Sequence, residues 1–258
     1  MSHSRRSFLI GVPTVAAAAM VASSASTAVA APAKAAATPS HQSPIDIRSR
    51  SAVDAPKLPE LVVDYPQHLD LHVHYISKDA PGDAAGCTVR GPEETVEAEV
   101  PAGAAAVHVG GVRYELVQFH FHTHSEHELD GHRFPLEQHF VHRGPQGQTL
   151  VVGLFLTGGG PGGTLQDEVL RARVEECGPT KEVTTDLRAA LPHDLSTFRY
   201  DGSLTTAPYT EGVAWLVLRQ HQAISDSAVA DFQKLFPKGN ARALQPLNDR
   251  TVQYRRQR

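Results

Sequence analysis

Short apolar runs, separated by glycine, proline and aspartate, fill the chain from residue 41 onward. Several runs alternate apolar with polar positions and are rich in β-branched, leucine and aromatic residues, a pattern typical of strands that bury one face. These runs span residues 61–65, 69–76, 112–124, 136–142, 150–156 and 213–219. The pattern predicts a single domain built mainly from antiparallel strands.

Helical patterns are fewer. Residues 225–235 predict one helix, because Ser225 can cap its first turn and apolar residues follow with helical spacing. Those apolar residues are Val229, Phe232 and Leu235. The glycine-rich stretch 158–163 predicts a loop. We therefore expect only minor helices beside the β-structure.

The first 30 residues differ in composition from the rest of the chain. Arg5 and Arg6 precede an alanine-rich apolar run, and residues 28–30 offer a small-x-small cleavage site, so residues 1–30 predict a twin-arginine export signal. The alternative is a membrane anchor, for which the run is weakly apolar. Residues 31–40 then predict a linker and residues 41–258 the folded domain. The expected location is extracellular, in the cell wall or in a periplasm-like space.

Charge and cysteine content narrow the possible partners. The chain carries 24 Lys and Arg against 28 Asp and Glu, a formal net charge of −4, which argues against binding to nucleic acid. After the signal, no segment has the apolar length of a membrane span, so we expect no stable span in the mature protein. Cys87 and Cys177 can form a disulfide in an oxidising compartment or remain two free thiols, and their spacing decides neither.

The most informative stretch is residues 118–131, QFHFHTHSEHELDG. If it begins as a strand, alternate side chains point to opposite faces. One face then carries Gln118, His120, His122 and His124, and the other carries Phe119 and Phe121. The phenylalanine face predicts contact with the core. The histidine face is costly to bury unless its rings have polar partners or bind a metal.

Two imidazoles two positions apart on a strand can converge on one metal ion. A catalytic zinc takes three protein ligands and leaves a fourth position to water. The next predicted strand, residues 136–142, places Glu137, His139 and Val141 on one face, and a turn at residues 130–131 can set His139 opposite the first pair. Gln118 and Glu137 can accept hydrogen bonds from ligand rings. Glu126 is a further candidate for a buried carboxylate, and a surface histidine cluster is the alternative.

Four motifs follow one another in a specific order. They are QSPIDI at residues 42–47, the two histidine strands, GSLTTAP at residues 202–208 with Trp215 after it, and the closing NAR at 240–242 and QPL at 245–247. In this order the sequence resembles the α class of carbonic anhydrases over roughly residues 41–253. The resemblance implies a large twisted, mostly antiparallel central sheet with short peripheral helices.

The resemblance also implies a function and a metal centre. The implied reaction is the reversible hydration of carbon dioxide to bicarbonate and a proton, by attack of zinc-bound hydroxide on this small-molecule substrate. The implied zinc ligands are His120, His122 and His139. Their implied hydrogen-bond partners are Gln118, Glu137 and the backbone carbonyl of Asn240.

Further residues match positions around that centre. Thr205 matches the threonine that orients the hydroxide and donates a hydrogen bond to a carboxylate, which Glu126 matches; Thr206 lines the same site. An apolar wall for carbon dioxide is implied for Val141, Val151, Leu204 and Trp215.

The sequence departs from the family at the proton-transfer position. Glu94 falls where many members carry a histidine, and a free glutamate has a pKa near 4.3, a poor match for a relay near pH 7. His124 is a possible substitute, with a surface histidine as the alternative. The aromatic segment that usually precedes QSPIDI is also missing, which puts stability in doubt. Tyr209 stands where bacterial relatives often carry a cysteine, so any disulfide here differs from theirs.

Two rival functions stay open at this point. The chain could be a catalytically weak or inactive zinc-binding relative of the family. Alternatively, the spacing of His120, His122 and Glu126 partly imitates the iron or manganese motif of cupins, and metal analysis separates the two. Physiological role and oligomeric state do not follow from the sequence.

Overall fold

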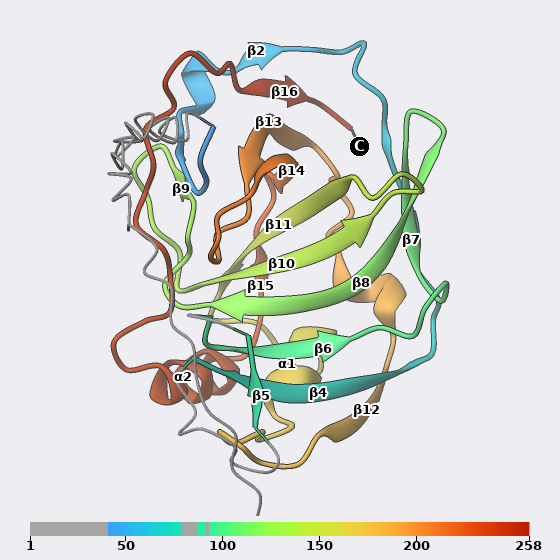
Figure 1. Cartoon of the computed structure of the whole chain (residues 1–258), viewed down its shortest axis with the longest axis vertical. Helices are drawn as coiled ribbons and strands as arrows, with labels where there is room; N and C mark the ends of the chain where they lie inside the picture. The colour runs from blue at the N-terminus through green and yellow to red at the C-terminus, as the bar shows by residue number, and fades with distance from the viewer. Residues whose placement is uncertain (1–40, 79–86, 91–92, 258) are drawn as a thin grey trace, which may run out of the picture. The chain divides into compact units, whose positions relative to one another are not determined.

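The computed structural model describes residues 41–78, 87–90 and 93–257 (Figure 1). The predicted export signal and linker, residues 1–40, lie outside the described residues. The described chain folds around one large twisted sheet of mixed strand direction. This confirms the predicted mainly β fold class, with strand pairs that are mostly antiparallel and a parallel pairing near the centre.

The sheet runs in one continuous order from its lower to its upper edge in Figure 1. In that order the strands are β12 (Lys181–Thr185), β4 (Leu69–Ser77), β6 (Thr95–Glu99), β8 (Val112–His122), β10 (Leu136–Arg143), β11 (Thr149–Thr157), β14 (Glu211–Leu218), β13 (Thr197–Ser203), β16 (Gln253–Arg255) and β2 (Val53–Asp54). Shorter strands attach to this path: β3 (Leu61–Asp64), β5 (Thr88–Val89), β7 (Ala106–Val109) and β15 (Gln222–Ala223). A separate parallel pair joins β1 (Asp46–Ile47) to β9 (Glu128–Leu129).

The predicted strands are present with small shifts at their ends. The prediction for residues 112–124 was two residues too long, because β8 ends at His122. The chain then leaves the sheet, so the alternation no longer applies to His124, whose side chain is exposed. The expectation that His124 shares the face of His120 and His122 was therefore wrong.

The helices are short and peripheral, as expected. Helix α2 (Asp226–Leu235) begins after Ser225, whose side chain accepts a hydrogen bond from the backbone N–H of Ala228. Val229 and Phe232 are buried, whereas Leu235, in the last turn, is 37% exposed. The sequence reading missed α1 (Leu165–Leu170), which a capping box starts.

Two 3₁₀ turns complete the described secondary structure: η1 (Ser49–Ser51) and η2 (Leu187–Ala190). Neither α1 nor α2, the α-helices of the described residues, has the length and apolar character needed to cross a bilayer.

Apolar clusters lie on both faces of the sheet. The larger cluster contains Phe119, Phe121 and Phe140, all fully buried, on the face that the alternation of β8 predicted for them. The smaller cluster lies on the opposite face and includes Ile45, Val151 and Trp215. The histidines of β8 and β10 share the second face, so that side of the sheet combines apolar packing with buried polar groups.

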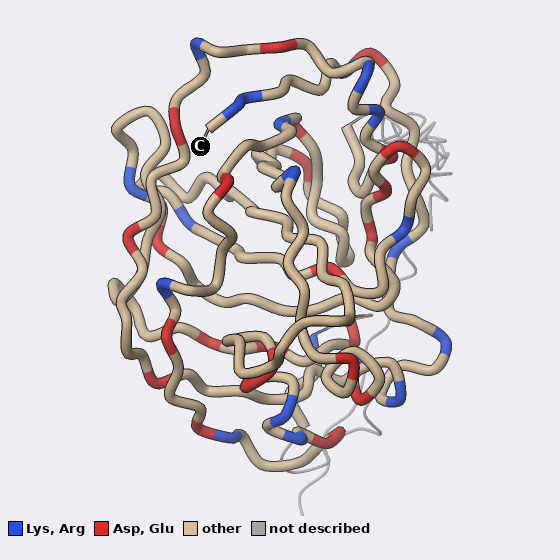
Figure 2. Tube along the Cα trace, turned by 180° about the vertical axis from the view of Figure 1, so that it is seen from behind, with Lys and Arg blue, Asp and Glu red and all other residues tan. Residues whose placement is uncertain are grey.

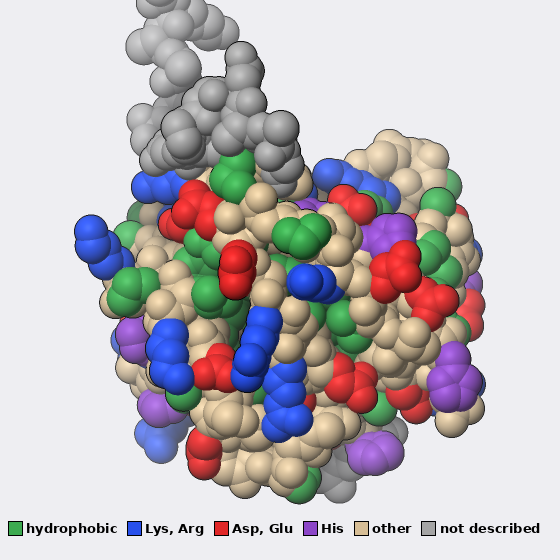
Figure 3. Space-filling model, turned by 90° about the horizontal axis from the view of Figure 1, so that it is seen from below, with side chains coloured by type: hydrophobic (Ala, Val, Ile, Leu, Met, Phe, Trp, Pro, Cys, Tyr) green, Lys and Arg blue, Asp and Glu red, His purple; other side chains and the backbone are tan. Residues whose placement is uncertain are grey.

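Acidic and basic residues are interspersed over the described surface. Figure 2 shows both signs around the periphery of the chain, and on the face in Figure 3 acidic side chains lie beside the basic ones. This distribution agrees with the small negative net charge. The question that the sequence left open about the cysteines is also answered, because Cys87 and Cys177 are joined by a disulfide.

Candidate metal centre

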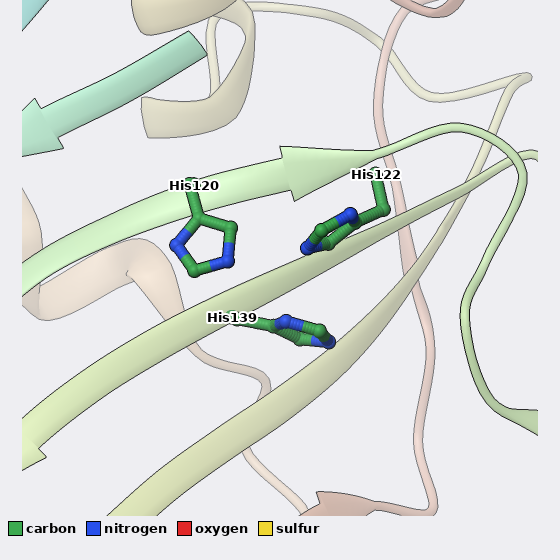
Figure 4. Close-up of side chains that lie close together, drawn as sticks. All are labelled: His120, His122 and His139. Carbon is green, nitrogen blue, oxygen red and sulfur yellow. The ribbon is translucent and has the colours of Figure 1, made fainter. Parts of the chain in front are cut away.

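Three histidine rings from two neighbouring strands meet on one face of the sheet (Figure 4). β8 and β10 pair antiparallel with His139 opposite His120 and Glu137 opposite His122. The ring centroids are 5.0 Å apart for His120 and His122, 5.3 Å for His120 and His139, and 4.6 Å for His122 and His139. The rings are almost fully buried, with residue exposures of 6%, 2% and 1% in chain order.

Each ring uses one nitrogen for a partner inside the protein. His120 Nδ1 lies 2.8 Å from Gln118 Oε1, and His139 Nε2 lies 2.9 Å from Glu137 Oε1. His122 Nδ1 lies 3.3 Å from the carbonyl oxygen of Asn240. These acceptors fix the tautomer of each ring and leave three nitrogens for a metal: Nε2 of His120, Nε2 of His122 and Nδ1 of His139.

Asn240 reaches the centre from the far end of the sequence. Its backbone N–H donates to the Thr123 carbonyl at 2.9 Å, and its Oδ1 accepts from the Thr123 N–H at 2.7 Å. Its Nδ2 donates to the carbonyls of Phe121 at 3.0 Å and Glu94 at 2.8 Å. The side-chain amide thus ties this segment to the end of β8, and the Asn240 carbonyl is held facing the His122 ring.

Glu137 anchors a chain of buried hydrogen bonds that the sequence reading missed. Its two oxygens accept from the backbone N–H of His127 at 2.8 Å and contact His127 Nδ1 at 2.7 Å. His127 Nε2 in turn lies 2.6 Å from the Tyr200 hydroxyl, which lies 2.8 Å from Ser43 Oγ. His127 stands within the histidine-rich motif, but it follows the end of β8, so strand alternation could not place it.

The same series of buried hydrogen bonds explains the glycine of the GSLTT motif, Gly202. A Cβ at Gly202 would lie 2.1 Å from Ser43 Oγ, far inside contact distance. Only glycine therefore lets β13 approach the QSPIDI segment this closely. The two motifs, distant in sequence, are parts of one structural unit behind the metal centre.

The donor set fits zinc. One nitrogen of each ring lies within 4.8 Å of a nitrogen of each of the other two rings, and three neutral imidazoles are a typical shell for catalytic zinc. His122 Nε2 is buried and finds no hydrogen-bond partner among the residues that the structure describes, so it is an unsatisfied atom that a metal would satisfy. Burial lowers the pKa of His120 and of His122, which favours the neutral rings that bind metal.

Two adjoining cavities open beside the rings. One, of about 240 Å³, is lined by His122, Glu126, Thr205 and Thr206, among others. The second, of about 210 Å³, is lined by His120 and His139 and shares Thr205 and Thr206 with the first. The structure therefore brings the predicted threonines and the predicted carboxylate to the same place as the three rings.

The predicted hydrogen bond from Thr205 to Glu126 is not formed between these described residues. Glu126 Oε1 instead accepts from the backbone N–H of Arg242 at 2.7 Å. Its Oε2 has no hydrogen-bond partner in the described residues and lies 3.6 Å from His122 Nε2 and 3.8 Å from His139 Nδ1. The second carboxylate oxygen therefore lies beside the free nitrogens of the His122 and His139 rings.

The four residues predicted for the apolar wall line one cavity, the one beside His120 and His139. They are Val141, Val151, Leu204 and Trp215. The Trp215 indole is fixed by a hydrogen bond from Nε1 to the Ser203 carbonyl at 2.9 Å, and its ring centroid lies 4.8 Å from that of His139. A small apolar molecule in this cavity would lie between the wall and the rings of His120 and His139.

The two candidate proton-transfer residues have different surroundings. Glu94 lines the cavity next to His122, and its Oε1 accepts a hydrogen bond from the Tyr75 hydroxyl at 2.6 Å. His124 is exposed and lines neither of the two cavities beside the rings. Of the two, only Glu94 faces the site.

Arg90 is a cavity residue that the sequence reading did not single out. Its guanidinium lines the cavity beside His120 and forms ion pairs with Glu93, at 2.9 Å from Nε, and with the buried Glu97. Arg90 follows Cys87, whose disulfide to Cys177 anchors this stretch of chain. No motif indicated this arrangement, because it depends on where the disulfide brings the loop.

The fold and the three-histidine site define a β-sheet protein with a buried candidate metal centre beside an apolar cavity. A model of the eukaryotic-type carbonic anhydrase family matches residues 30–256, so the chain belongs to this family. This result confirms the resemblance seen in the sequence motifs.

Individual relatives agree with the family. A carbonic anhydrase from Nostoc sp. is 41% identical over 143 residues, which are 54% of this chain and 53% of the relative. The α-carbonic anhydrase from Thermovibrio ammonificans, solved with the inhibitor sulfanilamide, is 34% identical with a TM-score of 0.69, over 83% of this chain and 86% of that one. Dioscorin complexed with ascorbate is 26% identical with a TM-score of 0.69, over 85% and 87%. The chain spans only 53% to 63% of the length of the first three curated relatives it matches.

Proposed function

We propose that this protein is a zinc-dependent carbonic anhydrase that hydrates carbon dioxide reversibly to bicarbonate and a proton. One observation carries the proposal: three buried rings each commit one nitrogen to an internal acceptor and leave the other for a metal, beside a cavity with an apolar wall. A structural zinc site would instead be closed by a fourth protein ligand.

The residues of the site have two proposed roles: some bind the metal and others bind the substrate. His120, His122 and His139 would hold zinc. When bound, zinc lowers the pKa of a water ligand to about 7 and so supplies hydroxide at neutral pH. Val151 and Trp215 offer carbon dioxide an apolar surface at the side of the rings, which places the substrate without a polar contact that would compete with the reaction.

Thr205 and Glu126 lie where they can orient the attacking oxygen. Both line the cavity beside His122, and Thr205 is 8% exposed. A threonine hydroxyl that donates its proton to a carboxylate must accept from the group in front of it, which selects one orientation of that group. The proposal therefore requires the Thr205 hydroxyl to donate to Glu126 in the metal-loaded protein.

A carbon dioxide hydration assay on purified mature protein, together with metal analysis, tests the proposal. We expect about one zinc per chain and a hydration rate that His122→Ala abolishes along with the bound zinc. His68→Ala, which removes an exposed histidine far along the sequence from the motifs, is the matched control and should change neither readout. Protein that retains no zinc, or that binds iron or manganese instead, would contradict the assignment.

The alternative is a zinc-binding protein with weak or no hydration activity. Two observations favour it: the Arg90 ion pairs beside His120, and the Glu126 carboxylate, which accepts from the Arg242 N–H and lies near His122 instead of accepting from Thr205. The same experiment separates the two functions. Stoichiometric zinc without a His122-dependent rate supports the alternative.

We also propose export from the cytoplasm by the twin-arginine signal in residues 1–30. The Cys87–Cys177 disulfide supports this location, because such bonds persist mainly in oxidising compartments. Replacement of Arg5 and Arg6 by lysine should retain the full-length precursor inside the cell, which fractionation and immunoblotting would detect. Unchanged export of that variant would reject the signal.

A further inference from the structure

A second polar site lies on the face of the sheet opposite the metal centre. On β13, Tyr200 pairs with Trp215 and shares the face of the histidines, whereas the preceding residue, Arg199, pairs with Leu216. Leu216 belongs to the larger apolar cluster. The Arg199 side chain therefore extends over an apolar face, separated from the metal centre by the sheet itself.

Within the described part of the chain, Arg199 is buried there without an acidic partner. The residue is 7% exposed, and its Nε donates to Thr197 Oγ1 at 2.8 Å. Its Nη2 is buried and has no hydrogen-bond partner among the described residues. Burial, together with the nearby charge of Arg255, lowers the pKa of Arg199 to about 10, so the guanidinium is still protonated at neutral pH. Arg255 offers no compensation, because it is itself a cation and pairs with Glu60 at 3.0 Å.

A buried charge of this kind is costly unless a counter-charge lies beside it. Among the described residues no ion pair joins Arg199 to a carboxylate, although the exposed Asp201 lines the same cavity. That cavity has a volume of about 240 Å³ and is also lined by Tyr114, Thr251 and Gln253, which add polar side chains to an otherwise apolar wall. The site thus has a cation, hydrogen-bonding groups and space.

We propose that the cavity at Arg199 binds a small planar oxyanion of the carboxylate class, which includes bicarbonate. A guanidinium presents its N–H groups in a flat fork that matches the two oxygens of such an anion, and the pair is stronger than neutral hydrogen bonds. The small volume favours ions of a few atoms. The inference stands apart from the proposed function, because none of the three histidines lines this cavity, although Tyr200 and Trp215 do.

Thermal unfolding of the mature protein in different anions tests the site. At constant ionic strength, with a bulky organic sulfonate as the balancing anion, bicarbonate or acetate at about five times its Kd should raise the Tm by about 2–4 °C. Chloride, which lacks the planar pair of oxygens, should raise it less. The series is repeated in the His122→Ala background, so that anion binding at a metal cannot produce the shift.

Three variants decide the assignment. Arg199→Met should abolish the shift by bicarbonate and acetate, and Arg199→Lys, which keeps the charge but lacks the fork, should reduce it and keeps the test available if the methionine variant does not fold. Arg188→Met, which removes an exposed arginine elsewhere, should leave the shift unchanged. No shift in the wild type, or an equal shift in Arg199→Met, would overturn the proposal.

Discussion

The two faces of strands β8 and β10 share one backbone but differ in what their side chains need when they are buried. On one face the Phe119 ring packs against those of Phe121 and Phe140, with ring centroids 6.0 Å and 5.5 Å apart. On the other face lie His120 and His139, which are the chain neighbours of Phe119 and Phe140 and stand opposite each other in the strand pair. The apolar face needs only neighbours of suitable shape, whereas each ring of the polar face needs a specific hydrogen-bond acceptor.

We infer from this difference that the apolar face mainly determines stability and that the polar face mainly determines metal binding. Burial of a phenylalanine is favourable wherever the packing is close. Burial of an imidazole without a partner is unfavourable by about 1–3 kcal/mol, so the polar face depends on acceptors such as Glu137 and the Asn240 carbonyl. We therefore expect changes on the apolar face to reduce stability, and changes on the polar face to reduce metal binding.

The largest effect should come from the apolar face. Phe140→Ala should reduce the free energy of unfolding by about 3–5 kcal/mol, because it leaves a cavity in the larger cluster. Urea unfolding measures this change, and the zinc content of the folded fraction should stay the same. Val117→Ala, at a position on β8 that is 44% exposed, is the control and should cost less than about 0.5 kcal/mol. If Phe140→Ala lost zinc without losing stability, the assignment of stability to the apolar face and of metal binding to the polar face would be wrong.

The second largest effect should come from a polar pair, Tyr65 and His142, that is buried on the apolar face. His142 pairs with Leu116 and Leu150 of the larger cluster, and its Nε2 lies 2.8 Å from the buried Tyr65 hydroxyl. Burial lowers the pKa of His142 to about 4. The unfolded chain, with a pKa near 6.5, binds more protons between these values, so stability falls as the pH drops from about 6.5 to 4.

The expected loss from this residue is about 3 kcal/mol across that window, because each pKa unit corresponds to 1.36 kcal/mol. Chemical unfolding at several pH values measures it. The double variant Tyr65→Phe, His142→Leu removes both polar groups and should show a shallower pH dependence by about that amount. An unchanged slope in the double variant would mean that His142 does not titrate on unfolding.

A smaller effect should appear on the polar face. Glu137→Gln keeps the shape of the side chain but removes the negative charge that His127 and His139 contact. We expect zinc affinity to fall by about 10- to 100-fold, as for other residues that orient a metal ligand. Competition with a chromogenic chelator measures the affinity. Glu115→Gln, at an exposed position on β8, should have no effect, and equal affinities for both variants would exclude a role for the Glu137 charge.

The smallest effect concerns the transfer of protons from the site to solvent. If hydration occurs as proposed, turnover should be limited by proton transfer, because Glu94 faces the cavity where a group with a pKa near 7 is needed. Added imidazole buffer should raise kcat of the wild type. Glu94→His should raise kcat at low buffer by about tenfold, equivalent to ~1.4 kcal/mol of barrier, and should make it less dependent on buffer. His124→Ala is the control, and a wild-type rate that is independent of buffer would contradict the prediction.

The sequence by itself determined the repeating features of this protein. Alternation in residues 118–122 assigned phenylalanines to one face and histidines to the other, and the structure shows that arrangement because successive side chains of a strand must point to opposite sides. The motif order was also sufficient to predict the family and the mainly β fold. These features depend on neighbours in the chain, so local patterns contain them.

Only the tertiary structure decided which distant groups meet. Strand β8 ends at His122, after which His124 is exposed and His127 contacts Glu137. The alternation of strand residues could not predict either position. The Cys87–Cys177 disulfide and the buried, unpaired Arg199 likewise depend on how loops and strands close in space. Periodicity fixes the direction of a side chain relative to its own strand, but the partner it finds there is set by the packing of the whole chain.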